Sequence, residues 1–453
     1  MTFRFPTVAD YDDAYRKGTT DPVAVAERAL QGARTLDRMD PPMRTFIALD
    51  EGDVRRQAEA AAKRRQKGAP LSPLDGVPVA VKDEYDVVGY GTTCGTKFLG
   101  KAPAEADALT VARLRAAGAV IFGKTNMSEL GVAPSGVNPW HGIARNPYDP
   151  ARDTGGSSTG SGACVGMGLT PIALGNDGGG SVRIPAAHNG VVGIKGTFGR
   201  VPMDGVPVLC WSLEHSGPLG ATVADTLLAF DVITDERLVL AELPRPLRIG
   251  VCERWWQWAD TEVASIVRSA VEKIVGGQIV DIDLPHIELS LPVGAATFTV
   301  EGAAAMDSAL TRGEPLSAST RIAFEMARAM SAVSYVKTQR ARALVVRDFE
   351  WAWDNVDVII TPTTATTAPP IPHDAAGGEL DEEKINRQVT FTFASNLSGM
   401  PAVSVPCGYD ASGMPVGMQI IAPHGEDLRA LAVAAAVEHN TQRHKPQVWC
   451  APL

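Results

Sequence analysis

Apolar residues near the start of the chain recur at the spacing of amphipathic helices. The segment 21–39 opens with Asp21, a residue type that caps helix N-termini, and has Pro22 at the first helical position. The segment 50–68 ends in basic residues and Gly68, as expected at a helix C-terminus. These patterns predict that residues 1–70 form a helical N-terminal segment.

The apolar period changes to two between residues 74 and 87. Val77, Val79 and Val81 share one face there, and Lys82 lies on the opposite face at the end of the run. This alternation predicts a strand. Further strands are predicted at 119–123, 247–251, 278–285, 356–363, 400–408 and 416–423, and further helices at 105–117, 261–275 and 426–440. The helix–strand steps indicate a layered α/β fold.

Glycine, serine and proline are dense between residues 131 and 205, but apolar runs interrupt them. We therefore expect close-packed loops and short helices there, because a linker would be more uniformly polar. The whole chain has 453 residues, 45% of them hydrophobic, which is an ordinary globular composition.

Charge and cysteine usage narrow the class of protein. The net charge is −10 and no run of Lys and Arg marks a nucleic-acid groove, so no nucleic-acid partner is expected. The six cysteines are scattered, as is typical of reduced thiols. No signal peptide and no apolar stretch long enough to span a membrane are visible, so a cytoplasmic protein is expected.

Two short motifs suggest chemistry that their surroundings do not support. Residues 156–160 fit the G-x-S-x-G nucleophile elbow, but a turn-rich segment precedes them and no histidine stands in a suggestive context. Residues 334–337 fit S-x-x-K, which is interpreted as a helix surface because no K-T-G follows. No metal-binding motif or phosphate-binding loop is present, so neither a metal nor a cofactor is expected.

A serine chemistry without histidine is the remaining candidate. Ser181 follows Gly178, Gly179 and Gly180. A stretch without β-carbons can turn its backbone N–H groups toward one point and so stabilise an oxyanion. Taken alone, the three glycines favour a plain glycine-rich turn.

A serine nucleophile needs a base, and Lys82 is the best candidate. Its side chain either extends to solvent or is held in the interior, where the neutral amine is favoured. The small residues at 155–163 form a tight helix entry capped by Ser157 or Ser158, or they place a hydroxyl between Lys82 and Ser181 as a proton relay.

Together these pieces resemble the amidase signature family. The matching segments are LDGVPVAVKDEYDV at 74–87, GKTNMSELG at 123–131, NPYDPARDTGGSSTGSGA at 146–163 and GNDGGGSVRIPAAHNGVVGIKGTFGRVP at 175–202, with weaker matches at 356–363 and toward the end of the chain. The likeness is weakest over residues 285–350. It implies one amidase domain over 1–453, with 74–205 as catalytic core and 285–350 as a variable, substrate-specifying helical region. The implied fold is a large mixed central sheet covered by helices on both faces.

The resemblance also implies roles for individual residues. Ser181 is the expected acyl nucleophile, and Lys82 is the expected base. Ser157 is the expected bridging serine, and a cis peptide bond precedes it. The oxyanion donors are the backbone N–H groups of Gly178, Gly179, Gly180 and Ser181. Met127 and Trp211 are expected at the substrate, and Phe298, Met306 and Phe324 are candidates for pocket walls.

The resemblance is nearer to the fatty-acid-amide-hydrolase-like branch, because Gly178 stands where the subunit of the tRNA-linked transamidase has threonine. The expected enzyme cleaves the C–N bond of a carboxylic amide, and esters as well, and acts as a monomer or homodimer on a small-molecule amide. The alternative is a glutaminase subunit that releases ammonia for an amidotransferase complex.

Overall fold

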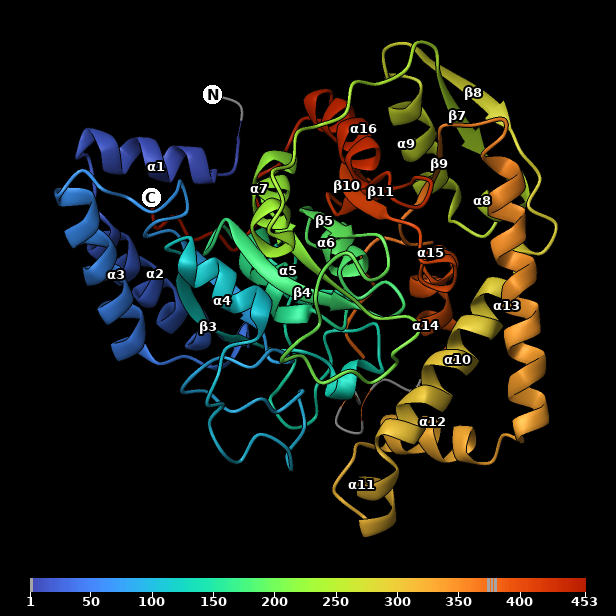
Figure 1. Ribbon diagram of the computed structural model, residues 1–453, viewed down its shortest axis with the longest axis horizontal. Helices are drawn as coiled ribbons and strands as arrows, with labels where there is room; N and C mark the ends of the chain where they lie inside the picture. The colour runs from blue at the N-terminus through green and yellow to red at the C-terminus, as the bar shows by residue number, and fades with distance from the viewer. Residues whose placement is uncertain (1–2, 373–374, 376–377, 379–380) are drawn as a thin grey trace.

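One mixed sheet runs through the protein (Figure 1). The computed structural model describes residues 3–372, 375, 378 and 381–453, and within these ranges eleven strands form the sheet in the order β1-β3-β2-β4-β6-β5-β10-β11-β9-β7-β8. Strand β2 is parallel to β3 and β4, strand β7 is parallel to β8 and β9, and the other neighbours are antiparallel. The predicted fold class, a large mixed α/β sheet, is confirmed.

Every predicted strand is present, but the prediction of loops and short helices over 131–205 is wrong where the structure has the strands Ile172–Asp177 and Val192–Lys195. The strands are β1 (Phe46–Ala48), β2 (Pro78–Lys82), β3 (Val120–Thr125), β4 (Ile172–Asp177), β5 (Val192–Lys195), β6 (His215–Gly220), β7 (Leu247–Val251), β8 (Gly277–Asp281), β9 (Val358–Pro362), β10 (Ala402–Tyr409) and β11 (Pro415–Ile421). Strand β1 lies inside the segment predicted to be helical throughout, so that prediction is wrong there. Three residues are too few to establish a period of two.

Helices cover both faces of the sheet. The helices are α1 (Val8–Lys17), α2 (Pro22–Asp37), α3 (Glu51–Gln66), α4 (Leu109–Ala116), α5 (Thr159–Gly166), α6 (Arg183–His188), α7 (Val223–Thr234), α8 (Glu253–Trp256), α9 (Thr261–Val271), α10 (Ser290–Ala305), α11 (Asp307–Arg312), α12 (Ala318–Arg328), α13 (Ala332–Ala352), α14 (Glu382–Val389), α15 (Phe393–Ser398) and α16 (Asp427–His439), with 3₁₀ turns at Glu129–Gly131 and Ile287–Leu289. Asp21 caps α2 through the backbone N–H of Ala24, and Pro22 opens the helix, as predicted.

Strand β2 shows how the two faces are filled. Val79 and Val81 belong to the core cluster that includes residues of α4, α7, α9 and α16. Ala80 belongs to the cluster that includes residues of α2, α3 and α5. Every residue of β2 is therefore buried, although its sequence alternates in size. Lys82 is the last residue of this doubly covered strand.

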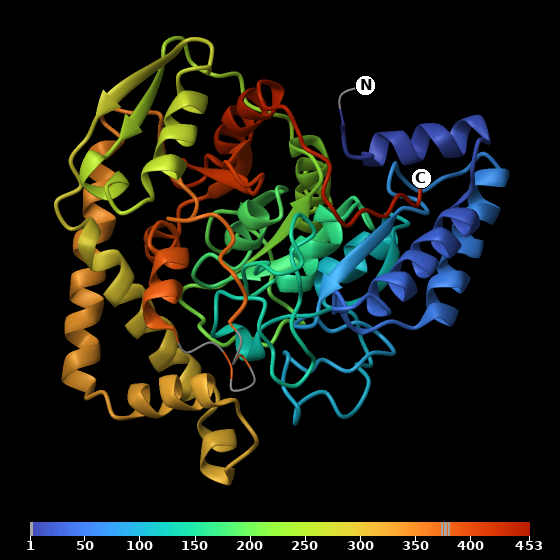
Figure 2. The ribbon, with the colours of Figure 1, turned by 180° about the vertical axis from the view of Figure 1, so that it is seen from behind.

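Helices α10 to α13 stand together at one end of the sheet, opposite the helices α1 to α3 (Figure 2). They coincide with the part of the chain where the resemblance is weakest. The two ends of the chain meet at the other end of the sheet, where the rings of Phe5 and Trp449 lie 5.2 Å apart.

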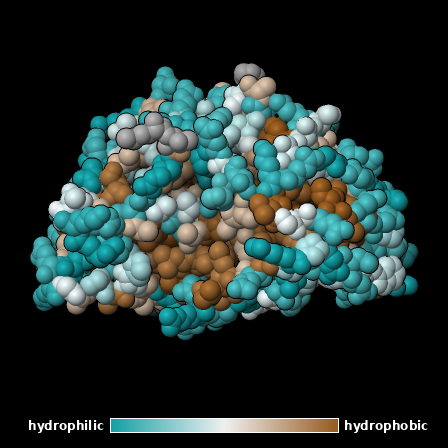
Figure 3. All heavy atoms as spheres, turned by 90° about the horizontal axis from the view of Figure 1, so that it is seen from above, coloured by the Kyte–Doolittle hydropathy of each residue, from teal (hydrophilic) through white to brown (hydrophobic). Residues whose placement is uncertain are grey.

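Hydrophobic side chains gather on the face seen from above, over the side of the sheet that α7 and α16 cover (Figure 3). Partly buried Leu227, Leu228 and Leu428 pack on the sheet core from these two helices. Among the helices in the described ranges, none is long and apolar enough to cross a membrane.

Asp225 makes the stability of this region depend on pH. Its carboxylate accepts the N–H of Val8 at 2.8 Å and the hydroxyl of Thr222 at 2.7 Å, which joins α1 to α7. Burial has the largest effect on the pKa of this carboxyl group and raises it to about 7, although the hydrogen bonds act to lower it. A raised carboxyl pKa means that the folded state binds more protons than the unfolded state between about pH 4 and pH 7.

The stability that Asp225 contributes is therefore present below about pH 4 and falls as the pH rises toward 7. We expect the unfolding free energy of the wild type, relative to Asp225→Asn, to fall by about 1.4 kcal/mol per pH unit in this window. Urea unfolding of both proteins at several pH values measures it. A difference that stays constant with pH contradicts the assignment.

Candidate active site

Lys82 points into the interior, so the alternative of a side chain extended to solvent does not hold. Its side chain is 1% exposed, and its Nζ lies 2.8 Å from Oγ of Ser157, which is itself only 2% exposed. Strand β2, flanked by β3 and β4, fixes the lysine at its carboxyl end. Two of the predicted catalytic side chains are thus in direct contact although they lie far apart in the sequence.

The neighbouring serines 157 and 158 have different surroundings. Ser158 Oγ accepts the backbone N–H of Asn176 at 3.3 Å and donates to the carbonyl of the same residue at 3.4 Å. Its hydroxyl is therefore used in holding the backbone together. Its backbone N–H donates to the carbonyl of Ser181 at 3.2 Å. The Gly156–Ser157 peptide is cis, as the resemblance implies. Only Ser157 presents its hydroxyl to Lys82.

Ser181 lies in the loop between β4 and α6 and is 8% exposed. The loop requires glycine before the serine, because Gly180 has a φ of +126°, where side chains are strained. A β-carbon on Gly180 would also stand 2.5 Å from Oγ1 of Thr392. The hydrogen bond from Ser158 to the Ser181 carbonyl holds this loop against the segment that carries Ser157.

A buried ion pair anchors the glycine loop. Arg183 donates to both carboxylate oxygens of Asp177, at 2.9 and 3.0 Å, and both side chains are fully buried. The same guanidinium donates to Ser395 and Gln419 at 2.6 Å, which joins the loop to α15 and β11. Burial by itself raises the pKa of Asp177, but the charge and hydrogen bonds of Arg183 outweigh it and hold that pKa below the usual range.

Asp177 also determines which backbone N–H groups of the loop are free. The N–H of Gly180 donates to Oδ1 of Asp177 at 2.7 Å, and the N–H of Val182 donates to Oδ2 at 3.1 Å. Gly180 is therefore engaged within the protein in this conformation, which differs from the expectation that it serves an oxyanion. The expectation for Gly178, Gly179 and Ser181 is untouched by these bonds.

Replacing Arg183 tests this anchor. The variant Arg183→Met leaves the buried charge of Asp177 unpaired, so we expect a loss of about 3–5 kcal/mol in unfolding free energy, measured by urea denaturation. The matched control is Arg4→Met, which removes an exposed ion pair with Asp10 and should cost about 1 kcal/mol or less. Equal losses in the two variants would contradict a structural role for the buried pair.

Two buried acidic residues, Glu84 beside Lys82 and Glu214 beside the glycine loop, were not singled out by sequence reasoning. Glu84 places Oε2 at 2.7 Å from Lys82 Nζ, with side-chain exposures of 5% and 1%. Burial, followed by the charge of Glu84, raises the pKa of Glu214 to about 7. The motif around Lys82 contains Glu84, but its alternating pattern gave no reason to place the carboxylate beside the amine.

The predicted substrate residues lie in different surroundings. Met127 is fully buried, and its carbonyl accepts the side-chain amide of Asn138 at 2.7 Å. Trp211 is 55% exposed and lines a cavity of about 240 Å³ together with Phe198 and Glu214. Of the candidate wall residues, Phe298 comes nearest to the glycine loop, since a β-carbon on Gly178 would lie 3.0 Å from its ring.

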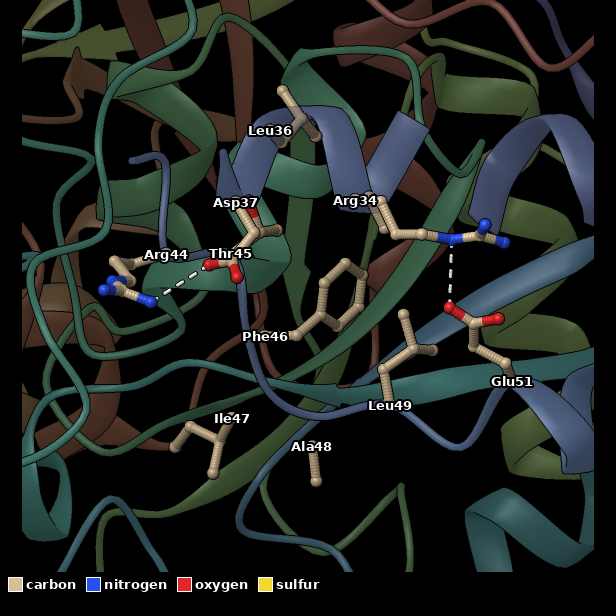
Figure 4. A pocket seen from close by; sticks show the side chains of 11 residues that line it. Arg34, Leu36, Asp37, Arg44, Thr45, Phe46, Ile47, Ala48, Leu49 and Glu51 are labelled. Atoms are coloured by element: carbon tan, nitrogen blue, oxygen red, sulfur yellow. Dashed lines mark hydrogen bonds and ion pairs between the residues drawn. The ribbon is translucent and has the colours of Figure 1, made fainter. Parts of the chain in front are cut away.

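A separate cavity of about 350 Å³ lies between α2 and β1 (Figure 4). Two ion pairs border it, Arg34 with Glu51 and Arg44 with Asp37, each at 3.0 Å. No proposed catalytic residue lines this cavity.

Comparison with known proteins identifies the family. The family model described as Amidase matches residues 32–431. The chain belongs to the amidase family. It is an amide-hydrolysing enzyme, and the resemblance drawn from the sequence motifs is confirmed.

The relatives of this amidase include fatty acid amide hydrolases and subunits of an amidotransferase. It is 36% identical to a fatty acid amide hydrolase of Oryza sativa subsp. indica over 96% of this chain and 76% of the relative. It is 33% identical to a subunit of the glutamyl-tRNA(Gln) amidotransferase of Thioalkalivibrio sulfidiphilus (strain HL-EbGR7) over 97% of this chain and 98% of the relative. A crystal structure of an amidase superimposes with a TM-score of 0.87 at 32% identity, over 96% of this chain and 100% of that one.

Proposed function

We propose that this amidase is a serine hydrolase that cleaves the C–N bond of a carboxylic amide, and esters as well, through an acyl-enzyme on Ser181. Ser157 relays the proton and Lys82 is the base. The observation that carries the proposal is the 2.8 Å contact between Lys82 Nζ and Ser157 Oγ, two side chains that are almost completely buried. The backbone bond from Ser158 to Ser181 supports it, because it keeps the two serine loops together.

The proposed reaction moves two protons, one from Ser181 to Ser157 and one from Ser157 to Lys82. Neutral Lys82 takes the proton of Ser157 while Ser157 takes that of Ser181, and the Ser181 oxygen attacks the amide carbonyl. The free N–H groups of the glycine loop stabilise the oxyanion. The relay then runs backward and protonates the leaving nitrogen, which makes the amine a leaving group. A water molecule uses the same relay to release the acyl group and restore Ser181.

A second candidate function is that of a glutaminase subunit of an amidotransferase. It is favoured by the similarity to the glutamyl-tRNA(Gln) amidotransferase component over almost the whole length of both chains. We prefer the enzyme acting alone in the cytoplasm, as a monomer or homodimer. The identity to the fatty acid amide hydrolase is higher, and Gly178 stands in the glycine loop where threonine is expected for the amidotransferase component.

Purified protein without partners tests the two candidates. We expect it to release amine or ammonia from members of a panel of acyl and aryl amides, and to leave free glutamine unchanged. The preference would be overturned if the protein hydrolysed glutamine and no other amide of the panel, and did so only after the other subunits of an amidotransferase were added. No turnover of any amide and no labelling by a fluorophosphonate would overturn the serine mechanism.

A further inference from the structure

The amine of Lys82 has three polar neighbours. Its Nζ lies 2.7 Å from Oε2 of Glu84, 2.8 Å from Oγ of Ser157 and 3.4 Å from the carbonyl of Asn176. An ammonium group has three N–H donors and no acceptor, so it fits this set of three oxygens. The geometry of the site at rest is that of a buried ion pair between Lys82 and Glu84.

An ammonium cannot act as the base that the proposed function requires of Lys82. One proton must leave Nζ before that nitrogen has a lone pair for the hydroxyl of Ser157. Of the three neighbours, the Asn176 carbonyl does not take up a proton and Ser157 is the group to be deprotonated. Glu84 is the remaining acceptor, and transfer within the pair removes two buried charges at once.

We propose that Glu84 is a positioning residue that stores the proton of Lys82 during catalysis. The inference rests on the proposed function. In the step, an N–H bond of Lys82 breaks and an O–H bond forms on Glu84, which leaves a neutral amine and a neutral carboxylic acid. The serine relay then turns over with the proton held on Glu84, and the proton returns to Lys82 when the product has left.

Glu214 supplies a second buried carboxyl group beside the glycine loop, since a β-carbon on Gly178 would lie 3.4 Å from its Cγ. Burial and the charge of Glu84 both raise its pKa. Its Oε1 accepts the backbone N–H groups of Leu209 and Cys210, both at 3.1 Å. Its Oε2 is buried and has no hydrogen-bond partner in the part of the chain that the structure describes. A negative charge on Glu214 favours the proton on Glu84, because a nearby like charge disfavours the ionised form of a carboxyl group.

Glu84 is surrounded by groups from several elements. The titratable and charged side chains that face it or act on it are Lys82 on β2, Asp83 and Tyr85 in the same turn, Lys124 on β3, Cys94, Cys210 and Glu214. Lys124 is paired with Asp83 at 3.0 Å, and both of these side chains are fully buried. The site therefore contains two adjacent buried ion pairs, of which only one touches Ser157.

The rate at which a fluorophosphonate labels Ser181 tests the proposal, because it reports the nucleophile without requiring the natural substrate. Intact-protein mass spectrometry between pH 6 and pH 10 gives this rate. In the wild type the proton stays inside the site, so the rate should rise a few-fold around pH 7, as Glu214 ionises, and then stay level. In Glu84→Gln the lysine must release its proton to solvent. Labelling should then be about 100-fold slower at pH 7 and rise about tenfold per pH unit until it reaches the wild-type rate.

Three variants separate this role from a structural one. Glu84→Asp should restore the level profile. Asp83→Asn removes an equally buried charge from the neighbouring pair and should keep the wild-type profile. Glu214→Gln should match the wild type below pH 7 and label a few-fold more slowly above it. These last two variants keep the test decisive if Glu84→Gln does not fold.

The results that overturn the proposal are distinct from those that overturn the proposed function. A Glu84→Gln rate that is unchanged, or lowered equally at every pH, removes the proton-storing role. So does a Glu214→Gln profile that follows the wild type throughout. If the wild type is not labelled on Ser181 at all, the proposed function itself fails, whatever the variants at Glu84 show.

Discussion

Replacing Ser181 with alanine is expected to lower amide turnover by at least about 10⁴-fold, because no other group can carry the acyl intermediate. The variant should fold normally, since the Ser181 hydroxyl has no hydrogen-bond partner within the part of the chain that the structure describes. Turnover of the most active amide and covalent labelling by a fluorophosphonate both measure the effect.

Ser158→Ala is the matched control for this experiment. It removes a buried hydroxyl only one residue from the relay serine, but keeps the backbone N–H that bonds to Ser181. We expect it to retain activity within about tenfold of the wild type, since its lost hydrogen bonds are worth about 1 kcal/mol. Residual activity of Ser181→Ala equal to that of Ser158→Ala would show that another residue is the nucleophile.

Replacing Lys82 with methionine is expected to lower turnover by about 10³-fold, because the variant keeps the length of the side chain and loses the base. Ser157→Ala should have a similar effect, and the double variant should be little worse than either single one. Such non-additivity is typical of residues that act as a unit. The measurement is kcat/KM for one amide in the four proteins.

Lys124→Met controls for the loss of a buried cation. Lys124 is as buried as Lys82 and pairs with Asp83 in the same way, but it does not contact Ser157. Both methionine variants leave a buried carboxylate unpaired and should lose stability in urea. If the folded Lys124→Met protein loses as much activity as Lys82→Met, the effect comes from the buried charge and a role as base is contradicted.

The sequence by itself determined the class of fold and the region of the site. The alternation at 74–87 placed Lys82 at the end of a strand, and the glycines before Ser181 indicated a loop with unusual backbone freedom. These are local properties, since side-chain period and the steric freedom of glycine act within a few residues. The strand β1 was not predicted, because three residues are too few to show an alternating pattern.

The tertiary structure decided whatever depends on contacts between distant segments. The alternation of β2 did not reveal that both of its faces are buried, so whether Lys82 extends to solvent or inward stayed open until the covering helices were in place. Ser157 and Ser158 are chemically identical in the sequence. Only the packing of β4 turns one toward the backbone of Asn176 and the other toward Lys82.

The electrostatics of the site also depend on contacts between segments that are distant in the sequence. Glu84 stands two residues from Lys82 in the chain, and Glu214 is far from both. The charge of Glu84 acts on Lys82 and on Glu214 because the fold buries all three side chains, where the effective dielectric constant is low. A sequence specifies which groups can ionise, and the three-dimensional arrangement decides which of their charges act on one another.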